Sequence, residues 1–355
     1  MHMIQEDILE IDGSFGEGGG SILRIGAGFS SLFSRAIRIK NIRANRPKPG
    51  LRMQHLIGLQ ILAELTNSNL SKCEVGSKEI TLVPNTEIKS KIDVNINTAG
   101  SIGLLLQPIQ IACLGFRSSE IININIQGGG TFGKWAPSLN YLQEVTYQLF
   151  RNSGLKIDVE IKKHGFYPKG GAQVQCILHS SQLDIKPINL IELGNLDIIK
   201  GEIIATNHLK NRNVGERIKK VIYQHIKRNI KIDLDVKISY VDSLSSGVGL
   251  SLWSLSDTGA IISTGTILGE KNMSSEKLGR LAADEMIKYI SNEIPVDNYL
   301  SDQLIPLMAF VKKPSRIKVE QITKHTLTNL ELTKLFTKRE YRVIKKKSHS
   351  IIEYI

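Results

Sequence analysis

The chain has 355 residues, of which 41% are hydrophobic and 23% are charged, and it carries a formal net charge of +12 at pH 7. This composition is ordinary for a globular protein, and the length suggests two or three domain-sized units. No stretch approaches the roughly 20 apolar residues that a membrane-spanning helix needs, which excludes a membrane-embedded protein.

The positive charge and the cysteines give the first indications of partner and location. A net charge of +12 favours polyanionic partners through counterion release and long-range attraction, although a solvated, lysine-rich surface explains the same charge. The three cysteines lie far apart and form no CxxC pair, which indicates a reducing compartment and no structural zinc site. The first residues, MHMIQEDILEIDGS, contain no apolar secretion segment, so we expect a cytoplasmic protein.

Near the start of the chain, the segment IDGSFGEGGGSILR holds a cluster of glycines around one acidic residue, Glu17. Glycine lets the backbone approach a ligand closely, and the amide groups at the start of the following helix attract anions. Glu17 is placed to hold a divalent metal that bridges phosphate groups. The segment is neither a Walker A loop nor a GxGxxG motif, and a tight structural turn explains its glycines equally well.

The next segment of interest, IRANRPKPGLRMQH, concentrates basic residues in a predicted strand-to-helix loop. Guanidinium groups bind phosphate oxygens with two donors at once, so such a loop suits an oligophosphate. Two prolines stiffen the loop and limit the entropy that is lost on binding. A solvated basic loop is the alternative. The basic residues are Arg43, Arg46, Lys48, Arg52 and His55.

Three stretches of the chain repeat one order of elements: a helix rich in small residues, a strand, a polar loop and a second helix. The strands alternate between apolar and charged residues, as Ile37 and Ile39 do with Arg38 and Lys40. The order predicts an α+β fold built from three repeated sheet-plus-two-helix units. Chance similarity between generic α/β segments is the alternative. The three stretches are 18–65, 98–150 and 296–336.

The stretch between the second and third units, about 181–274, has strands and a helix of its own. We expect it to form a smaller α/β domain inserted between those units, so that 1–180 and 275–355 make up the repeat-built catalytic domain. The helical segment SSEKLGRLAADEMIKYI, which starts near Ser275, is expected to return the chain to the main domain.

The segment HGFYPKGGAQVQ, which precedes the predicted insert, has the form of a turn that leads into an alternating strand. A glycine-rich hairpin with a packed Tyr167 is favoured over a direct catalytic role for His164. Within the insert, Asp233 and Asp235 stand at strand spacing and should both face solvent, so they do not predict a metal site.

His325 lies near the C-terminus in KVEQITKHTLTNLELTKLF, after the strand of the third unit. The following residues, from Thr328 to Glu331, have the form of a capping box and predict that a helix starts there. A helix N-terminus attracts anions, and a neutral imidazole, with a usual pKa of about 6.5, is available near pH 7. His325 could therefore attack a phosphorus whose oxygens the helix holds. A histidine without a catalytic role is the alternative.

Six of these segments together resemble the RNA 3'-terminal phosphate cyclase family, and the resemblance covers nearly the whole chain. They occur in the order that the family has: IDGSFGEGGGSILR, RANRPKPGLRMQHL, AGSIGLLLQ, HGFYPKGGAQV, YLSDQL and KHTLTN. The family also has three repeated units and an α/β domain inserted between the second and third. One departure is Ser21, which stands where the family usually has glutamine.

The resemblance implies an ATP-dependent reaction. A histidine of the enzyme attacks the α-phosphorus of ATP, releases pyrophosphate and becomes linked to AMP. The AMP then passes to the 3'-terminal phosphate of an RNA, and the neighbouring 2'-hydroxyl closes a 2',3'-cyclic phosphate and expels AMP. The implied partners are ATP, an RNA with a 3'-terminal phosphate, and a divalent metal, magnesium or manganese.

The resemblance also implies roles for individual residues. His325 matches the histidine that is adenylylated, and Glu17 matches a carboxylate linked to the metal. Gln54 and His55 match family positions, without an assigned role. Three arginines match positions near the phosphates: Arg24, Arg43 and Arg46. The remaining ATP-binding positions are Gln107, Tyr299, Leu300, Ser301, Asp302 and Gln303.

Two other functions are compatible with parts of the pattern. One branch of the same superfamily acts in ribosomal RNA maturation without cyclase activity and lacks the reactive histidine, so His325 argues against it. Enolpyruvyl transferases are built from similar repeats and act on small phosphorylated metabolites, but their motifs are missing from this sequence.

Overall fold

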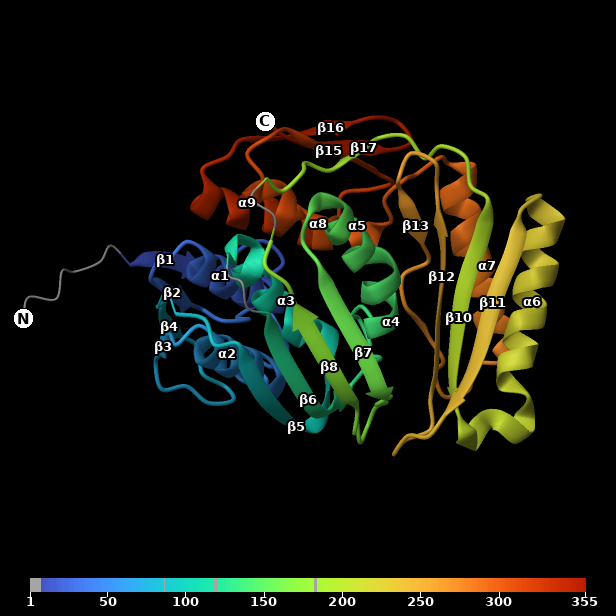
Figure 1. Ribbon diagram of the computed structural model, residues 1–355, viewed down its shortest axis with the longest axis horizontal. Helices are drawn as coiled ribbons and strands as arrows, with labels where there is room; N and C mark the ends of the chain where they lie inside the picture. The colour runs from blue at the N-terminus through green and yellow to red at the C-terminus, as the bar shows by residue number, and fades with distance from the viewer. Residues whose placement is uncertain (1–7, 86, 118–120, 182–183) are drawn as a thin grey trace, which may run out of the picture.

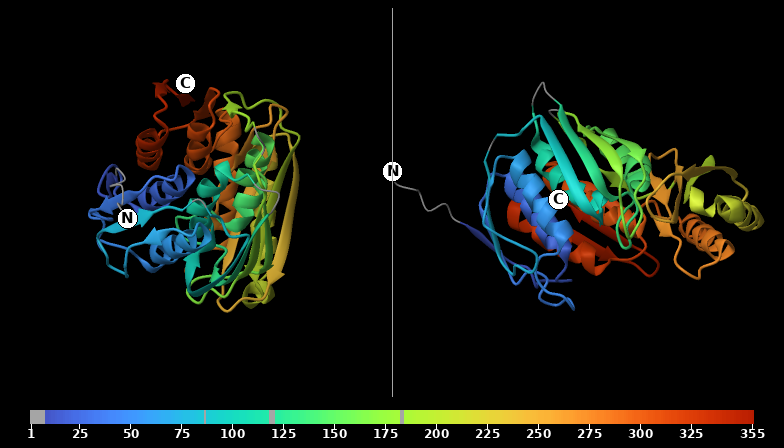
Figure 2. Two further views of the ribbon diagram at one scale, coloured as in Figure 1. Left: turned by 60° about the vertical axis from the view of Figure 1, so that its left-hand side comes forward. Right: turned by 90° about the horizontal axis from the view of Figure 1, so that it is seen from below.

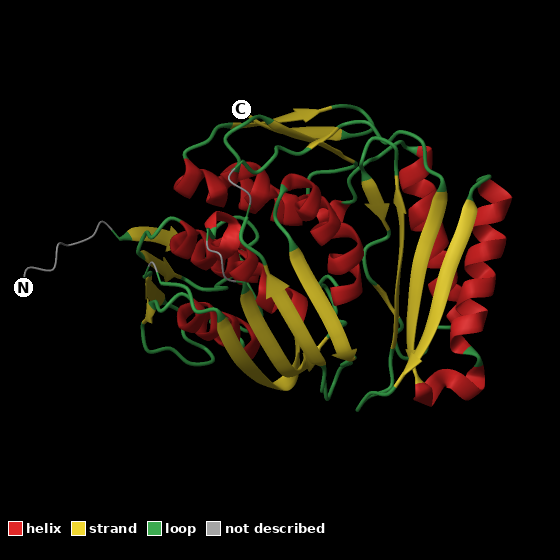
Figure 3. Cartoon of the chain, in the orientation of Figure 1, coloured by secondary structure: helices red, strands yellow, loops and turns green. Residues whose placement is uncertain are grey.

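The computed structural model describes residues 8–85, 87–117, 121–181 and 184–355. The prediction of an α+β fold is confirmed, because helices and mixed sheets alternate along the chain. Figures 1 and 3 show most of the helices gathered in the interior, with sheets around them and a separate layered unit at one end. No helix within the described ranges is both long and apolar enough to cross a membrane.

The first sheet has the strand order β1-β2-β4-β3. Strands β1 and β2 are parallel and joined through a helix, whereas β4 is antiparallel to both of its neighbours. The predicted alternation in β2 is confirmed: Ile37 and Ile39 are buried, and Arg38 and Lys40 are half-exposed. The elements are β1 (Leu9–Asp12), α1 (Gly20–Leu32), β2 (Ile37–Lys40), α2 (Met53–Leu65), β3 (Asn69–Leu70) and β4 (Ile80–Val83).

The second sheet, β5-β6-β8-β7, has the same arrangement of one parallel and two antiparallel pairs. Its second helical segment contains a π-helical turn between two α-helical pieces. The elements are β5 (Lys91–Ser101), α3 (Ile102–Ala112), η1 (Cys113–Gly115), β6 (Ile122–Gly130), α4 (Leu139–Tyr141), η2 (Leu142–Thr146), α5 (Tyr147–Ser153), β7 (Ile157–Lys163) and β8 (Gln173–Leu178).

The third sheet, β9-β15-β17-β16, again pairs its first two strands in parallel and the others antiparallel. Its first strand, β9, lies far from the rest in sequence, because the whole layered unit at the end of the molecule comes between β9 and the next helix. The elements are β9 (Asn189–Leu190), α8 (Asn298–Phe310), β15 (Ser315–Val319), α9 (Lys324–Thr337), β16 (Tyr341–Lys345) and β17 (Ser350–Tyr354).

The layered unit at the end of the molecule has a five-stranded sheet covered by two helices (Figure 2). It has its own hydrophobic cluster, to which Ile218, Leu278 and Met286 contribute. Its elements are β10 (Ile198–Thr206), η3 (Asn207–Arg212), α6 (Val214–Asn229), β11 (Asp233–Val241), β12 (Val248–Leu255), β13 (Ile261–Ser263), β14 (Ile267–Leu268) and α7 (Ser275–Ser291).

The packing bears on where the inserted domain begins and ends. Helix α7, expected to belong to the main domain, buries its apolar face in the cluster of the five-stranded sheet. Strand β9, inside the expected insert of 181–274, pairs with β15 of the third sheet. We therefore propose limits of 198–291 for the inserted unit, which places it within the third sheet-plus-helix unit.

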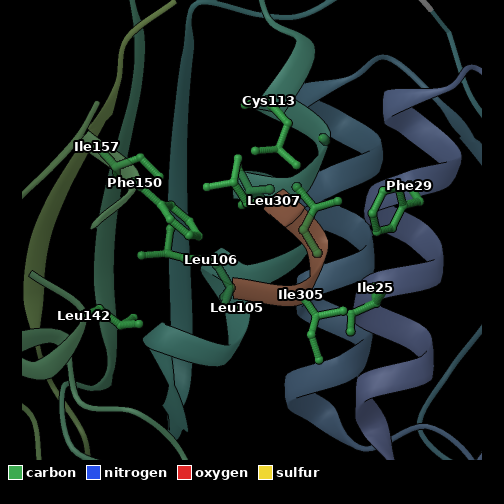
Figure 4. Close-up of a cluster of buried hydrophobic side chains, with 14 of the residues drawn as sticks. Ile25, Phe29, Leu105, Leu106, Cys113, Leu142, Phe150, Ile157, Ile305 and Leu307 are labelled. Carbon is green, nitrogen blue, oxygen red and sulfur yellow. The ribbon is translucent and has the colours of Figure 1, made fainter. Parts of the chain in front are cut away.

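The main core lies where helices of the three four-stranded units meet. Figure 4 shows Ile25 and Phe29 of α1, Leu106 of α3, and Ile305 and Leu307 of α8 directed into one cluster. All five side chains are at most 2% exposed. Because α1, α8 and α9 share this core, the N-terminal ends of α1 and α9 are held in a fixed relation to each other.

Helix α1 approaches α3 closely at a glycine, and this contact yields a prediction on stability. A Cβ atom at Gly28 would lie 2.8 Å from the carbonyl oxygen of Pro108 and 2.8 Å from Cβ of Ile111. We expect Gly28→Ala to lower the free energy of unfolding by about 1–3 kcal/mol through overpacking. Gly58 of α2 is a matched control, because a Cβ there meets nothing within 4 Å.

For Gly58→Ala we expect a gain of about 1 kcal/mol, since alanine favours a helix over glycine. Urea-induced unfolding of both variants, followed by circular dichroism, measures the two changes. If the two substitutions changed the free energy of unfolding equally, the α1–α3 contact would have accommodated the added methyl group without strain.

Candidate functional site

A cavity of about 410 Å³ lies among the N-terminal parts of α1, α8 and α9, with residues 133–137 on its rim. The inserted unit contributes part of the wall through Thr266, Leu268 and Glu270. Such a volume is in the usual range for a small-molecule site. Six of the site residues that were predicted from the sequence lie on the wall of this cavity: Arg24, Gln107, Tyr299, Asp302, Gln303 and His325.

His325 lines the cavity and pairs with Glu17, which does not itself line it. The Nε2 atom of His325 lies 3.0 Å from Oε2 of Glu17, and Nη2 of Arg46 donates to the same oxygen at 2.7 Å. The carboxylate is 6% exposed, whereas the imidazole is 50% exposed and thus open to a ligand. The hydroxyl of Ser21 donates to the other carboxylate oxygen at 3.0 Å.

The pairing shifts the titration of both groups. The hydrogen bond to Glu17 raises the pKa of His325, although burial acts in the opposite direction. Burial opposes ionisation of Glu17, but hydrogen bonds from His325 and Ser21 outweigh it and hold the pKa of the carboxyl below its usual value. Glu17 is therefore ionised at neutral pH, and His325 keeps its proton to a higher pH than an isolated histidine.

The start of α9 positions His325 differently from the prediction. The helix begins at Lys324, and its cap is Thr323, whose side chain accepts a hydrogen bond from the amide of Thr326. The predicted helix start at Thr328 is wrong, because Thr323 already satisfies this end. His325 therefore stands in the first helical turn instead of in the preceding loop.

Thr328 instead joins α9 to the glycine-rich segment. Its hydroxyl donates to the carbonyl of Lys324 and accepts from the backbone amide of Glu17 at 3.1 Å. Gly16 makes this approach possible: its φ is +58°, and a Cβ there would lie 2.2 Å from the Thr328 hydroxyl. The glycines of this segment thus serve a turn that presents Glu17 to His325.

Arg24 and Gln107 meet on the wall of the cavity, where Nε of Arg24 donates to Oε1 of Gln107 at 2.6 Å. Burial lowers the pKa of Arg24 to about 10, with the charge of Glu17 acting in the opposite direction. Arg24 is consequently still cationic at neutral pH. A buried guanidinium beside a cavity can bind the anionic part of a ligand.

Asp302 lies beneath the start of α9 and accepts a hydrogen bond from the hydroxyl of Thr326 at 2.8 Å. Burial raises the pKa of Asp302 to about 6. Two of its neighbours in YLSDQ face away from the cavity. Leu300 is fully buried in the main core, and the hydroxyl of Ser301 donates to the carbonyl of Asn298. Their predicted contact with ATP stays a prediction.

The basic loop divides into residues with different roles. Arg46 reaches Glu17, whereas Arg43 donates to the carbonyls of Lys48 and Gly50 and so braces its own loop. His55 accepts from the backbone amide of Arg52. Burial lowers the pKa of His55 to about 3, which keeps it neutral, and a structural role in the loop follows.

Asn329 was missed by the sequence analysis. It lines the cavity and is 2% exposed, and its Oδ1 atom has no hydrogen-bond partner among the described residues. A buried acceptor of this kind is available to a ligand. The segment KHTLTN contains Asn329, but its interpretation as part of a capping box concealed this role.

The fit of a divalent metal depends on Glu17. The described part of the chain contains no group of three His, Cys, Asp or Glu residues placed to hold a metal ion. A single carboxylate is nevertheless enough for magnesium when phosphate oxygens and water supply the other ligands. The donor set fits this kind of site, and the metal role of Glu17 stays a prediction.

Comparisons with known proteins show the family of the chain. The family model described as "RNA 3'-terminal phosphate cyclase" matches residues 15–343. A protein of that name from Methanosarcina barkeri is 37% identical over 348 residues, covering 96% of this chain and 97% of its own. Its namesake from Thermococcus gammatolerans is 36% identical and covers 94% of each chain. This chain therefore belongs to the RNA 3'-terminal phosphate cyclase family.

Proposed function

We propose that this chain converts the 3'-terminal phosphate of an RNA into a 2',3'-cyclic phosphodiester, with ATP as co-substrate and a histidyl–AMP intermediate. The observation that carries the proposal is the position of His325, which lines the cavity and pairs with the buried carboxylate of Glu17. Membership in the cyclase family supports the overall reaction.

The first step forms a bond between His325 and AMP. A ring nitrogen attacks the α-phosphorus of ATP, the bond from that phosphorus to the bridging oxygen breaks, and pyrophosphate leaves. The second step transfers AMP to an oxygen of the RNA 3'-phosphate and restores the histidine. The neighbouring 2'-hydroxyl then attacks the RNA phosphorus, loses its proton and expels AMP. The covalent intermediate divides one difficult displacement into easier steps.

The walls of the cavity supply groups that suit a nucleoside triphosphate. Arg24 is a buried cation that can bind phosphate oxygens. Tyr299 lines the cavity and is 56% exposed, so its ring offers a flat surface to a base. Gln107, Gln303 and Asn329 add amide groups on the same wall. Together they support binding of ATP next to His325.

A bound magnesium or manganese ion would neutralise charge on the phosphates and so ease the departure of pyrophosphate. Glu17 is the residue that would hold it.

A labelling experiment tests the proposal directly. The purified protein is incubated with a divalent metal and ATP that is radiolabelled at the α-phosphate, and is then denatured. The proposal requires label on the chain in an acid-labile, alkali-stable bond, as expected for a phosphoramidate. Absence of label from a protein that binds ATP or RNA would favour the branch of the superfamily without cyclase activity.

The pairing of His325 with Glu17 predicts how label transfer depends on pH. Only the neutral ring can attack, and the pair raises the pKa of His325 above its ordinary value of 6.5. We therefore expect the rate to rise with pH and to reach half of its maximum above pH 6.5. Single-turnover labelling at saturating ATP, measured across the neutral range, gives the midpoint; a midpoint at or below 6.5 would contradict the pairing.

A further inference from the structure

Trp135 stands out on the surface of the molecule. It is 90% exposed, which makes it the most exposed large apolar side chain in the described ranges. Tryptophan is highly buried on average, so an isolated tryptophan in water requires a reason. The position of the side chain suggests one, because Trp135 lies on the rim of the cavity that also contains His325.

The backbone at Trp135 adopts a conformation that this residue type rarely takes. Its φ is +58°, in the left-handed region that disfavours a bulky L residue. Such conformations persist where the surrounding structure imposes them, and they cluster at ligand sites. The exposure of Trp135 is thus a feature that the loop enforces.

The loop that carries Trp135 is fixed at both ends. Before it, Phe132 stacks on Phe166 of the β7–β8 hairpin, with ring centroids 5.0 Å apart. After it, the amide of Ser138 donates to the hydroxyl of Thr266 at 2.8 Å. These contacts tie the loop to the second sheet and to the inserted unit. The backbone that carries Trp135 is therefore anchored on both sides.

Lys134 places a positive charge beside the tryptophan. Its Nζ atom lies 4.9 Å from the centre of the Trp135 ring and 2.8 Å from Oε1 of Glu270 in the inserted unit. The lysine packs against one part of the ring, and the 90% exposure leaves the rest of it accessible. An aromatic surface next to a cation is the combination that single-stranded nucleic acids bind.

The proposed reaction explains why a second surface is needed at this rim. ATP and an RNA end must both reach His325, while a cavity of about 410 Å³ suits one nucleotide. Tyr299, Arg24 and Gln107 line the cavity and suit ATP. Trp135 lines the same cavity and is 90% exposed, so it stands where an RNA end that enters from solvent can meet it.

We propose that Trp135 is the stacking platform for the base at the 3' end of the RNA substrate, with Lys134 beside it to attract the RNA backbone. This inference rests on the proposed cyclase function. Stacking on an aromatic ring tolerates any base, because every base has a π face. We therefore expect the affinity for RNA to depend only weakly on the identity of the terminal base.

The hairpin beyond Phe166 provides a matched control. Tyr167 was expected to be packed, but it is 79% exposed, because Phe166 takes the packed position instead. Tyr167 is thus a second exposed aromatic residue on a neighbouring loop, and it does not line the cavity. The Tyr167→Ala substitution therefore tests whether loss of any exposed aromatic side chain near the site weakens RNA binding as Trp135→Ala is expected to do.

The experiment uses the fluorescence of Trp135. The chain has two tryptophans, and the other, Trp253, is partly buried against the main core. In the Trp253→Phe protein, a short RNA with a 3'-phosphate should quench the remaining fluorescence without ATP present. ATP alone should quench it little. Quenching by ATP with no further change on adding RNA would assign the ring to the nucleotide and overturn the proposal.

Kinetics give a second readout. Trp135→Ala should raise the KM for RNA about ten-fold, within the range for loss of one stacked base, and should raise the KM for ATP far less. Trp135→Phe should recover most of the affinity, and Tyr167→Ala should leave the RNA KM unchanged. An RNA KM in Trp135→Ala equal to that of the parent protein would refute the platform.

These outcomes separate the platform from the cyclase function. Fluorescence quenching reports binding and needs no turnover, so a protein that fails to cyclise RNA can still show stacking. A protein that cyclises RNA normally but shows no quenching contradicts the role of Trp135 alone.

Discussion

Replacing His325 with alanine is expected to abolish transfer of AMP to the chain and to reduce cyclisation by at least about a thousand-fold, as removal of a covalent nucleophile typically does. ATP should still bind, because Arg24, Gln107 and Tyr299 line the cavity independently of the imidazole. The measurements are label on the denatured protein, cyclic ends formed on RNA, and ATP affinity by equilibrium dialysis.

His349 offers the control for this substitution. It lies at the turn between β16 and β17, where its carbonyl accepts from the amide of Lys346 and its ring pairs with the hydroxyl of Ser348. His349→Ala should retain label and cyclisation at the level of the unaltered protein. Normal turnover by His325→Ala would exclude a histidyl–AMP intermediate at this residue. The cavity would then have no proposed nucleophile.

Replacing Glu17 with alanine is the second change from which we expect a large loss. The carboxylate lies among His325, Arg46 and Arg24, and among the described residues it is the acidic group that forms an ion pair with the imidazole. Without it, the imidazole loses its fixed orientation, and Arg46 and Arg24 lose the negative charge that lies between them. Misplacement of a reacting group by about 1 Å can reduce the rate a hundred-fold, so we expect a loss of label transfer of at least this size.

Glu17→Gln separates orientation from charge. Glutamine keeps an oxygen that can accept from His325 but removes the negative charge, so the pKa of His325 should fall toward or below its ordinary value. Titration of the His325 ring protons by NMR, in the absence of metal and ATP, measures this shift in both proteins. A pKa that is equal in the two proteins would show that Glu17 acts on the reaction by a route other than the imidazole.

Local sequence patterns predicted the parts of the site that depend on residue type. The glycines around Glu17 predicted either a ligand-binding loop or a tight turn. Gly16 lies in such a turn, against the hydroxyl of Thr328, and the binding of a ligand there stays a prediction. The alternation in β2 predicted which of its side chains are buried. In both cases the property belongs to a few adjacent residues and is encoded by their spacing.

Other features could not be obtained from the sequence because they depend on contacts between distant segments. Both Thr323 and Thr328 have the chemistry of a cap, and only the packing of α9 against the glycine-rich segment decides between them. The apolar stripe of α7 predicted a helix, but not that its partner would be α6. Likewise, no spacing rule distinguishes an exposed Trp135 from a buried one.

The hydrogen bond between the amide of Glu17 and Thr328 joins positions 311 residues apart. The carboxylate is translated before the helix that carries His325. A nascent chain therefore cannot pair the two groups until α9 has been made. Under the proposed function, a chain truncated before α9 could not form the histidyl–AMP link and could not hold ATP as a dead-end adenylate.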